Sequence, residues 1–413
     1  MDRKQHFVII LILGALATIS PFSIDMYLPG FPAIANDLNT TIDQVQLSLT
    51  SYFVGIAAGQ LLYGPLLDRY GRIKPLYIGL VGYVVASIGC ALTSSVDALI
   101  IARFVQALGG CVGMVAAQTL VRDLFPVNKT AQAFSLITLV IAVSPMIAPT
   151  VGGYVTAGIG WNWIFIILAV ITALIMLAVH FYLPRGKEAD PSLSLAPRAV
   201  LGNFRIVVKN DQYLIYTLAG GLGSAAPFAY IAGSPDVFMN IYGVSEQQYG
   251  WIFGGLAFAI IGSTQLNHIL LKRFKSEELV KIAFLYQGVA GAIMVAGTLY
   301  GSINLPAMLV LMFIFLSGHG IIGPNATALS LAPFAKYAGS AAALLGSWRM
   351  GMGALITGLV SFLHNHTALP MVGMMAACAW ASLGILLVGN AIVRRRAPNP
   401  DKHRDAEEAP VAL

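Results

Sequence analysis

The fold is decided by the stretch Gly64-Pro65-Leu66-Leu67-Asp68-Arg69-Tyr70-Gly71-Arg72-Ile73-Lys74-Pro75, which separates two apolar segments. Glycine and proline at its ends break helical geometry and allow a short reversal of the chain. Four charged residues, Asp68, Arg69, Arg72 and Lys74, stand in it, and hydrocarbon could not surround them. The stretch is therefore expected to be a tight loop that joins two membrane-spanning helices.

The composition places the rest of the chain in a bilayer as well. Of its 413 residues, 57% are hydrophobic and only 10% are charged, whereas about 25% charged is typical of a soluble domain. The mean hydropathy is +0.78. A spanning helix needs about 20 mostly apolar residues. The sequence predicts twelve such spans, at residues 6–34, 44–66, 74–94, 97–121, 131–156, 162–183, 211–239, 247–271, 278–300, 304–330, 337–363 and 368–393.

The basic residues indicate how the spans are oriented. All but two of the 24 Lys and Arg residues lie before the first span, in the even-numbered loops or after the last span. Because Lys and Arg are retained on the cytoplasmic side, both termini are predicted to be cytoplasmic. The net charge of +6 follows from this topology and does not favour nucleic acid as a partner. The two exceptions, Arg103 and Arg349, lie inside spans.

A polar segment with three prolines around residues 185–210 divides the spans into two sets of six. Such a linker is expected in a transporter built of two repeats. We therefore expect an all-α integral membrane protein with twelve transmembrane helices in two six-helix bundles. The expected parts are a first bundle, a central cytoplasmic loop, a second bundle and a disordered cytoplasmic tail, at residues 1–184, 185–210, 211–393 and 394–413.

Asp25 stands well inside the first span, in the run Ser23-Ile24-Asp25-Met26-Tyr27-Leu28-Pro29-Gly30-Phe31-Pro32. A carboxylate in hydrocarbon is unfavourable, so it must face a cavity, pair with a cation or hold a proton. We predict a proton-binding site. The alternatives are a carboxylate that caps a broken backbone at Pro29, or one that lies at the outer interface. The residues that share its helical face are mostly small or polar and suit a water-accessible groove: Gly14, Thr18, Pro21, Phe22, Pro29 and Pro32.

Arg103 stands early in the fourth span and shares one helical stripe with Gln106, Gly110, Met114 and Gln118. A buried guanidinium cannot lose its charge, so it must find a carboxylate or carbonyl oxygens. Two interpretations stay open at this point. Either Arg103 modulates the proton affinity of the membrane acid, or it ties helices together.

The fifth span carries a stripe of small residues. Two prolines four positions apart stiffen and bend the helix, and glycines let a neighbouring backbone approach closely. The stripe consists of Thr138, Ala142, Pro145, Pro149, Gly152, Gly153 and Thr156. A facing stripe on the eighth span is predicted to receive it, formed by Trp251, Gly255, Phe258 and Gly262.

The second half holds further polar residues within its spans. Arg349 is predicted to be a buried cation that neutralises a carboxylate such as Asp236, or that binds lipid or substrate. Asp236 itself is expected at the outer mouth, as a solvated helix end. His319 is the rival proton carrier, because an unperturbed imidazole titrates near neutral pH. Candidates for the substrate cavity, which packing or interfacial roles would equally explain, are Tyr52, Met114, Gln118, Tyr230, Trp251, His319, Asn325 and Arg349.

The sequence offers no enzymatic site. It has no Walker loop, so ATP is not expected as the energy source, and no cluster of His, Cys and carboxylate residues that would hold a metal. The cysteines, Cys90, Cys111 and Cys378, fall in apolar spans and are expected to be buried thiols without a disulfide. We expect a protein that is not an enzyme and that needs no cofactor.

Four segments together resemble the Bcr/CflA, or bicyclomycin-resistance, branch of the twelve-helix drug:proton antiporters in the major facilitator superfamily. The loop at residues 64–75 marks the superfamily, and the run Asp25-Met26-Tyr27-Leu28-Pro29 is specific to the branch. Residues 103–110 resemble the fourth-helix motif. Residues 149–153 resemble the end of the antiporter motif, although Ala148 replaces one of its glycines.

The resemblance implies a monomeric exporter of small amphiphilic compounds, such as bicyclomycin, phenicols or sulfonamides, in a bacterial inner membrane, with lipid around it and the proton gradient as its driving force. By this likeness Asp25 is the coupling acid and Arg103 its modulator. Ala17 stands where some relatives carry a second acid, so a low proton stoichiometry is expected.

The likeness also assigns two groups of gating residues. Asp68 would hold the cytoplasmic side closed against the start of the eleventh helix, together with Gly64, Arg69, Gly71 and Arg72. The antiporter motif would comprise Pro145, Pro149, Gly152 and Gly153, and it favours export. Two rival functions stay open: a proton-linked importer or exporter of a metabolite on the same fold, and a membrane sensor or scaffold that transports nothing.

Overall fold

The computed structural model describes residues 3–190, 197–334 and 338–396. Within these ranges the chain is helical and has no strand, and twelve helical segments are long and apolar enough to cross a membrane. The all-α class predicted from the sequence is confirmed. Residues 397–413, which make up most of the predicted tail, lie outside the described part.

The first half begins with a broken span, because the first helix stops and restarts within it. Its elements are α1 (Arg3–Asp25), the 3-10 turn η1 (Leu28–Gly30), α2 (Phe31–Asp37), α3 (Ile42–Tyr70), α4 (Ile73–Ala91), α5 (Val96–Leu124), α6 (Val127–Ile159) and α7 (Asn162–Tyr182). The ends of these spans agree with the predicted ends to within several residues.

The second half repeats the arrangement after a connecting helix. Its elements are α8 (Pro197–Val208), α9 (Asp211–Pro235), the π-helical turn η2 (Asp236–Ile241), α10 (Glu246–Leu270), α11 (Ser276–Leu299), α12 (Leu305–Leu331), α13 (Ala338–Phe362) and α14 (Leu369–Arg396). Two differences from the sequence prediction appear here. Residues 197–208 of the predicted central loop form the helix α8. The last apolar span ends at Val393, as predicted, but its helix α14 continues to Arg396, into the segment predicted as the tail.

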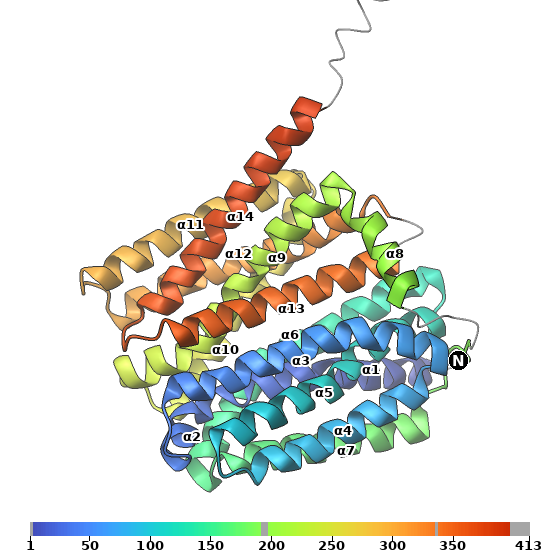
Figure 1. The fold of residues 1–413 in the computed structure, drawn as a ribbon, viewed down its shortest axis with the longest axis horizontal. Helices are drawn as coiled ribbons and strands as arrows, with labels where there is room; N and C mark the ends of the chain where they lie inside the picture. The colour runs from blue at the N-terminus through green and yellow to red at the C-terminus, as the bar shows by residue number, and fades with distance from the viewer. Residues whose placement is uncertain (1–2, 191–196, 335–337, 397–413) are drawn as a thin grey trace, which may run out of the picture.

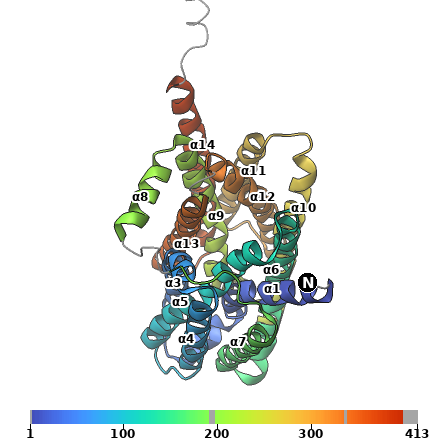
Figure 2. The same ribbon diagram turned by 90° about the vertical axis from the view of Figure 1, so that its right-hand side faces the viewer.

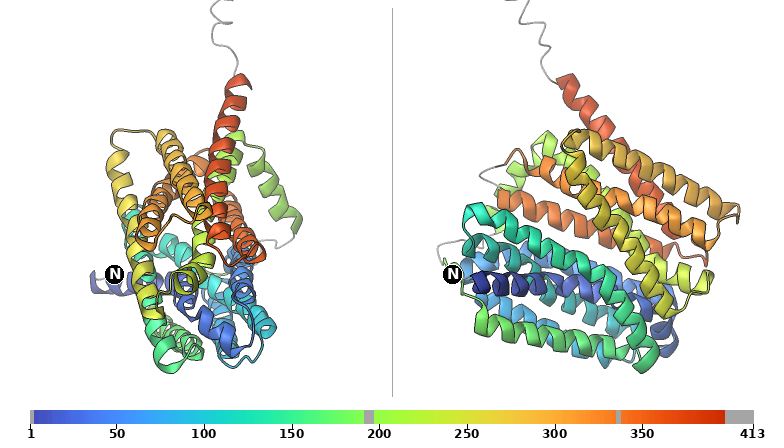
Figure 3. Two further views of the ribbon diagram at one scale, coloured as in Figure 1. Left: turned by 90° about the vertical axis from the view of Figure 1, so that its left-hand side faces the viewer. Right: turned by 180° about the vertical axis from the view of Figure 1, so that it is seen from behind.

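The two halves form separate bundles that pack side by side (Figures 1 and 2). In the first bundle α3 and α4 both pack on α5, and α4 also packs on α7. The same contacts recur six spans later, where α10 and α11 pack on α12 and α11 packs on α14. Figure 3 shows the bundles from two further sides. The structure therefore contains a repeat of six spans.

Two helix pairs join the bundles, α3 with α13 and α6 with α10. In the half of the molecule away from both termini, Thr50 on α3 donates a hydrogen bond to Thr357 on α13 at 3.0 Å. Near the same end the Ser361 hydroxyl donates to the Asp43 carbonyl at 2.6 Å. The Phe53 and Phe228 rings meet edge to face at 4.6 Å. These contacts close the end of the molecule that lies opposite the termini, which is called the outer end below.

Candidate functional site

The first span breaks at Asp25, and the backbone shows why. In a continuous helix the Tyr27 amide would bond the Ser23 carbonyl, but here it donates to the Ile24 carbonyl at 3.3 Å. Pro29, which has no N–H, cannot bond the carbonyl of Asp25. The chain then turns through η1 and restarts as α2. The break leaves the Ser23 carbonyl inside the bundle without its helical partner.

Arg103 on α5 fills this gap. Its Nη2 donates to the Ser23 carbonyl at 3.0 Å and its Nη1 donates to Gln106 Oε1 at 2.6 Å. The guanidinium carbon lies over the rings of Tyr52 and Tyr27, 4.0 and 4.6 Å from their centroids, an arrangement that stabilises a desolvated cation. The side chain is completely buried. The buried cation is therefore held by carbonyl oxygens and aromatic faces, and not by a carboxylate of the described chain.

A chain of hydrogen bonds continues from Gln106 to the third span and returns to the break. Gln106 Nε2 donates to Ser87 Oγ at 2.7 Å, and Ser87 in turn donates to the Tyr83 carbonyl at 2.7 Å. The Tyr83 and Ser23 hydroxyls are hydrogen-bonded to each other. Ser23, Tyr83 and Ser87 were not singled out as site residues from the sequence. Their one signal is that polar side chains recur inside otherwise apolar spans.

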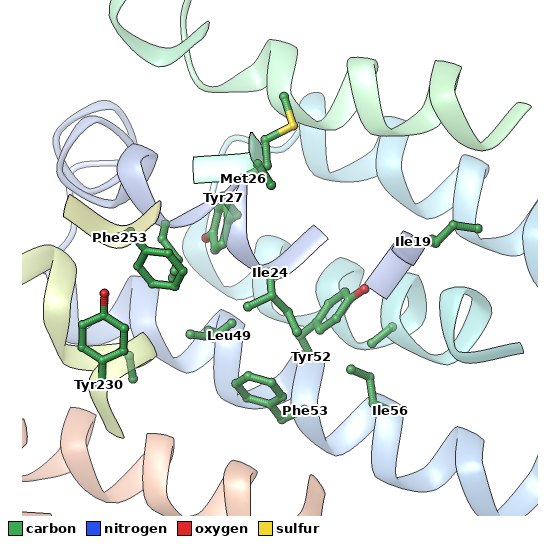
Figure 4. Packing of buried hydrophobic residues seen from close by; sticks show 14 of the residues in the cluster. Ile19, Ile24, Met26, Tyr27, Leu49, Tyr52, Phe53, Ile56, Tyr230 and Phe253 are labelled. Atoms are coloured by element: carbon green, nitrogen blue, oxygen red, sulfur yellow. The ribbon is translucent and has the colours of Figure 1, made fainter. Parts of the chain in front are cut away.

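Asp25 lies at the end of α1 and faces the second bundle. Its side chain is 5% exposed, and no residue of the described ranges offers it a hydrogen bond or a counter-charge. The carboxyl group is close enough to interact electrostatically with Tyr230 on α9 and Tyr249 on α10. Tyr230 stacks on Phe253 at 5.2 Å, opposite Tyr27 and Leu49 of the first bundle (Figure 4). The carboxyl group is thus enclosed between the two bundles at the break.

The glycines of α6 bring two backbones against this region. A Cβ atom on Gly152 would lie 2.1 Å from the Met26 carbonyl oxygen, and one on Gly153 would lie 2.5 Å from the Glu246 carbonyl oxygen at the start of α10. Pro145 and Pro149 both lie inside the same helix. The segment is therefore packed between the Asp25 break on one side and the second bundle on the other.

The partner of α6 is not the stripe expected from the sequence. Trp251 and Phe258 are 64% and 54% exposed, and a Cβ added to Gly255 or Gly262 would meet open space. The contact is made by a neighbouring face of α10, where Gly250 abuts Pro149 and Thr150, and Gly254 abuts Met146. A stripe of alternating large and small residues can face lipid as well as another helix. The sequence pattern was therefore wrongly interpreted as the face of α10 that contacts α6.

The stretch at residues 64–75 is mostly helical: α3 continues through Gly64 and Pro65 to Tyr70, and α4 begins at Ile73, so the loop expected there is limited to Gly71 and Arg72. The stretch contains a small ion-pair cluster. Arg72 is buried and bonds Asp68, four residues earlier, and Asp123 at the end of α5, with Nε 2.7 Å from Asp123 Oδ2. Gly71 has φ +80°, a conformation that favours glycine. Arg69 lies over the ring of Tyr70. Among the residues that the structure describes, Asp68 is therefore paired within its own bundle, and its side chain is 51% exposed.

The polar residues of the second bundle are paired differently from the expectation. Asp236 is buried and accepts hydrogen bonds from Asn240 at 2.8 Å and from the His364 ring at 2.9 Å. It is thus not a solvated helix end, and it does not neutralise Arg349. Arg349 donates from Nη2 to the Ser224 hydroxyl at 3.1 Å.

The remaining cavity candidates fall into three groups. Tyr52, Tyr230 and Asn325 are buried, and the Asn325 amide donates to Asn267 at 2.6 Å. Met114, His319 and Arg349 are partly buried within the bundles, whereas Gln118 and Trp251 are exposed. Trp251 lies on the exposed stripe of α10 and is therefore removed from the candidate cavity.

Comparison with known proteins identifies the superfamily of the chain. The profile of the Major Facilitator Superfamily matches residues 13–358. The chain belongs to this superfamily. It is 31% identical to the "Bicyclomycin resistance protein homolog" of Haemophilus influenzae over 382 residues, which cover 92% of this chain and 96% of that protein. It is 29% identical to "Multidrug resistance protein D" of Escherichia coli, with 94% and 96% covered.

Two solved structures have a fold similar to that of this chain. A bacterial homolog of the human lysosomal transporter Spinster, inward-facing and unoccupied, superposes with a TM-score of 0.68 at 16% identity, covering 95% of this chain and 96% of that chain. A D-xylose-proton symporter gives 0.71 at 14% identity, covering 92% and 97%. The protein is a multi-pass membrane transporter and not an enzyme, and the resemblance drawn from its motifs is confirmed.

Proposed function

We propose that this transporter exports small amphiphilic compounds across the bacterial inner membrane in exchange for protons, with both termini in the cytoplasm and Asp25 as the proton carrier. The observation that carries the proposal is the enclosed carboxyl group of Asp25, which has no cation and no hydrogen-bond donor beside it among the described residues. Relatives named for resistance to bicyclomycin and to several drugs support the substrate class.

The physical basis of coupling is the free energy of the Asp25 charge. An unpaired carboxylate in a low-dielectric interior is unfavourable, so enclosure between the bundles favours the protonated acid. Opening the end on the side of the termini, or placing a substrate with positive or dipolar character beside the group, favours release of the proton to that side. Opening the outer end lets the acid take up a new proton. Proton and substrate then compete for one cavity. Movement of one charge through 100 mV supplies about 2.3 kcal/mol per cycle.

Arg103 serves in this mechanism as a positioning residue. Its bond to the Ser23 carbonyl fixes the last turn of α1 two residues before Asp25. Arg103 would then affect proton binding through the position of Asp25 and not through its own charge, because Asp25 has no counter-charge among the described residues. The two interpretations drawn from the sequence, a modulator and a helix tie, then describe one contact.

Contacts at the two ends of the molecule would form and break during transport. The outer end closes through the bonds between α3 and α13 and through the glycines between α6 and α10. The Asp68, Arg72 and Asp123 cluster holds the ends of α3 and α5 together on the side of the termini. Rocking of the bundles about the Asp25 region would open one end as the other closes, as in other two-bundle transporters.

The test is proton-driven movement of chloramphenicol in proteoliposomes. With the wild-type protein, an imposed pH gradient should drive uptake into inverted vesicles, and an uncoupler should abolish it. Asp25→Asn should remove the response to the gradient while leaving passive exchange of the drug. Asp97→Asn, which removes an exposed carboxylate in the first turn of α5, should behave as the wild type. Gradient-driven transport at the wild-type rate by Asp25→Asn would refute the proposal, and flux in the opposite direction would indicate an importer.

A further inference from the structure

The centre of the second bundle contains a cation that no acid of the described residues balances. Arg349 lies midway along α13, and its guanidinium makes one hydrogen bond within the described residues, to the Ser224 hydroxyl at 3.1 Å. A guanidinium has five N–H donors and no acceptor. Most of its hydrogen-bonding capacity is therefore unused where water is scarce.

No carboxylate is available to this cation in its own bundle. Five acidic residues occur between residues 197 and 396, and all lie at helix ends: Asp211, Asp236, Glu246, Glu277 and Glu278. Asp236, the buried one, bonds Asn240 and His364. No acid of the described chain acts electrostatically on Arg349. An arginine keeps its charge in a protein, and a partly buried cation without a counter-ion is unfavourable.

The surroundings of Arg349 leave space for a bound group and provide a second unused polar atom. A Cβ added to Gly323 on α12 would lie 3.4 Å from the Arg349 Nη2 atom, so the glycine keeps that side of the guanidinium clear. His319, one turn away on α12, has a buried Nδ1 atom without a partner in the described part of the chain. The His319 ring is close enough to interact electrostatically with the Arg349 guanidinium. Arg349 and His319 thus converge on one region between α9, α12 and α13.

We propose that Arg349 binds the acidic group of the transported compound, and that the substrates include amphiphiles carrying a carboxylate. The proposal rests on the proposed export function, and it adds an anion subsite in the second bundle to the proton site in the first. Guanidinium and carboxylate form charge-assisted, bidentate pairs. A bound carboxylate therefore supplies the counter-ion that the described residues lack, and Asp25 remains free for the proton.

The experiment compares two fluorescent probes that differ only in the acid, dansylglycine and its methyl ester. Binding is measured by fluorescence with the full-length protein in phosphatidylcholine nanodiscs. Charge-assisted pairing should give the acid about a tenfold or greater advantage over the ester. Arg349→Gln should remove this advantage, so that the acid binds no more tightly than the ester, whereas Arg349→Lys should keep part of it. Arg205→Gln, which removes an exposed positive charge from α8, should keep all of it.

Three results would overturn the anion subsite. One is a wild-type protein that binds acid and ester equally, a comparison that needs no variant to fold. The second is an acid preference that persists in Arg349→Gln. The third is an acid preference that disappears when phosphatidylglycerol is added to the nanodiscs, which would assign the guanidinium to a lipid headgroup. Each of these results is compatible with a wild-type response to the proton gradient that Asp25→Asn lacks, so this inference and the proposed function fail separately.

Discussion

Removal of the Arg103 side chain should both destabilise the protein and uncouple it. Arg103→Ala deprives two buried acceptors, the Ser23 carbonyl and the Gln106 side-chain oxygen, of their charged donors. A buried acceptor left without a donor costs about 1–3 kcal/mol, so the two together give about 2–6 kcal/mol. The contacts with the Tyr27 and Tyr52 rings are lost as well.

The assay is thermal unfolding of the purified protein, followed by the transport measurement on the same sample. Arg103→Ala should unfold a few degrees below the wild type. Arg103→Lys should lie between them, because an ammonium keeps the charge but cannot reproduce the planar fork. Arg122→Ala, at an exposed position of the same helix, provides the matched control. An Arg103→Ala protein as stable as Arg122→Ala would refute the argument that the cation holds the break in α1.

Three further substitutions test other contacts. Gly152→Ala places a Cβ 2.1 Å from a backbone carbonyl of the broken span, so it should lower stability by about 1–3 kcal/mol, whereas Gly158→Ala, which meets open space, should not change the unfolding midpoint. Trp251→Ala removes an exposed ring, and chloramphenicol flux should stay at the wild-type rate; a large loss would return this residue to the cavity. His364→Ala leaves a buried carboxylate with one donor fewer and should lower the unfolding midpoint by more than His366→Ala, at an exposed position two residues later.

The spans and the charged residues within them could be predicted because hydrocarbon imposes a simple rule. Long apolar runs must be helices, and charges between them mark loops. Asp25 and Arg103 stand out for the same reason, as charges in the wrong solvent. The helix α8 escaped prediction because it is short, lies in a polar segment and begins at a proline, a residue that signals a linker as readily as a first helical turn.

The partners of these charges could not be predicted, because they depend on how the helices rotate and pack. Arg103 was expected to need a carboxylate or carbonyls, but only the break in α1 shows which carbonyl is free. Asp236 and His364 meet across 128 residues of sequence. Trp251 illustrates the opposite error, since a helical stripe states which residues share a face and not what that face contacts.

The most direct test of the central claim is proton release by the purified protein when a lipophilic cation, tetraphenylphosphonium, is added in lightly buffered solution with a pH-sensitive dye. The account predicts that binding releases a proton from the wild type and from Asp236→Asn, which alters the other buried carboxylate of the described spans, and releases none from Asp25→Asn. Equal release from Asp25→Asn, or tetraphenylphosphonium binding by the wild type with no release at all, would contradict it.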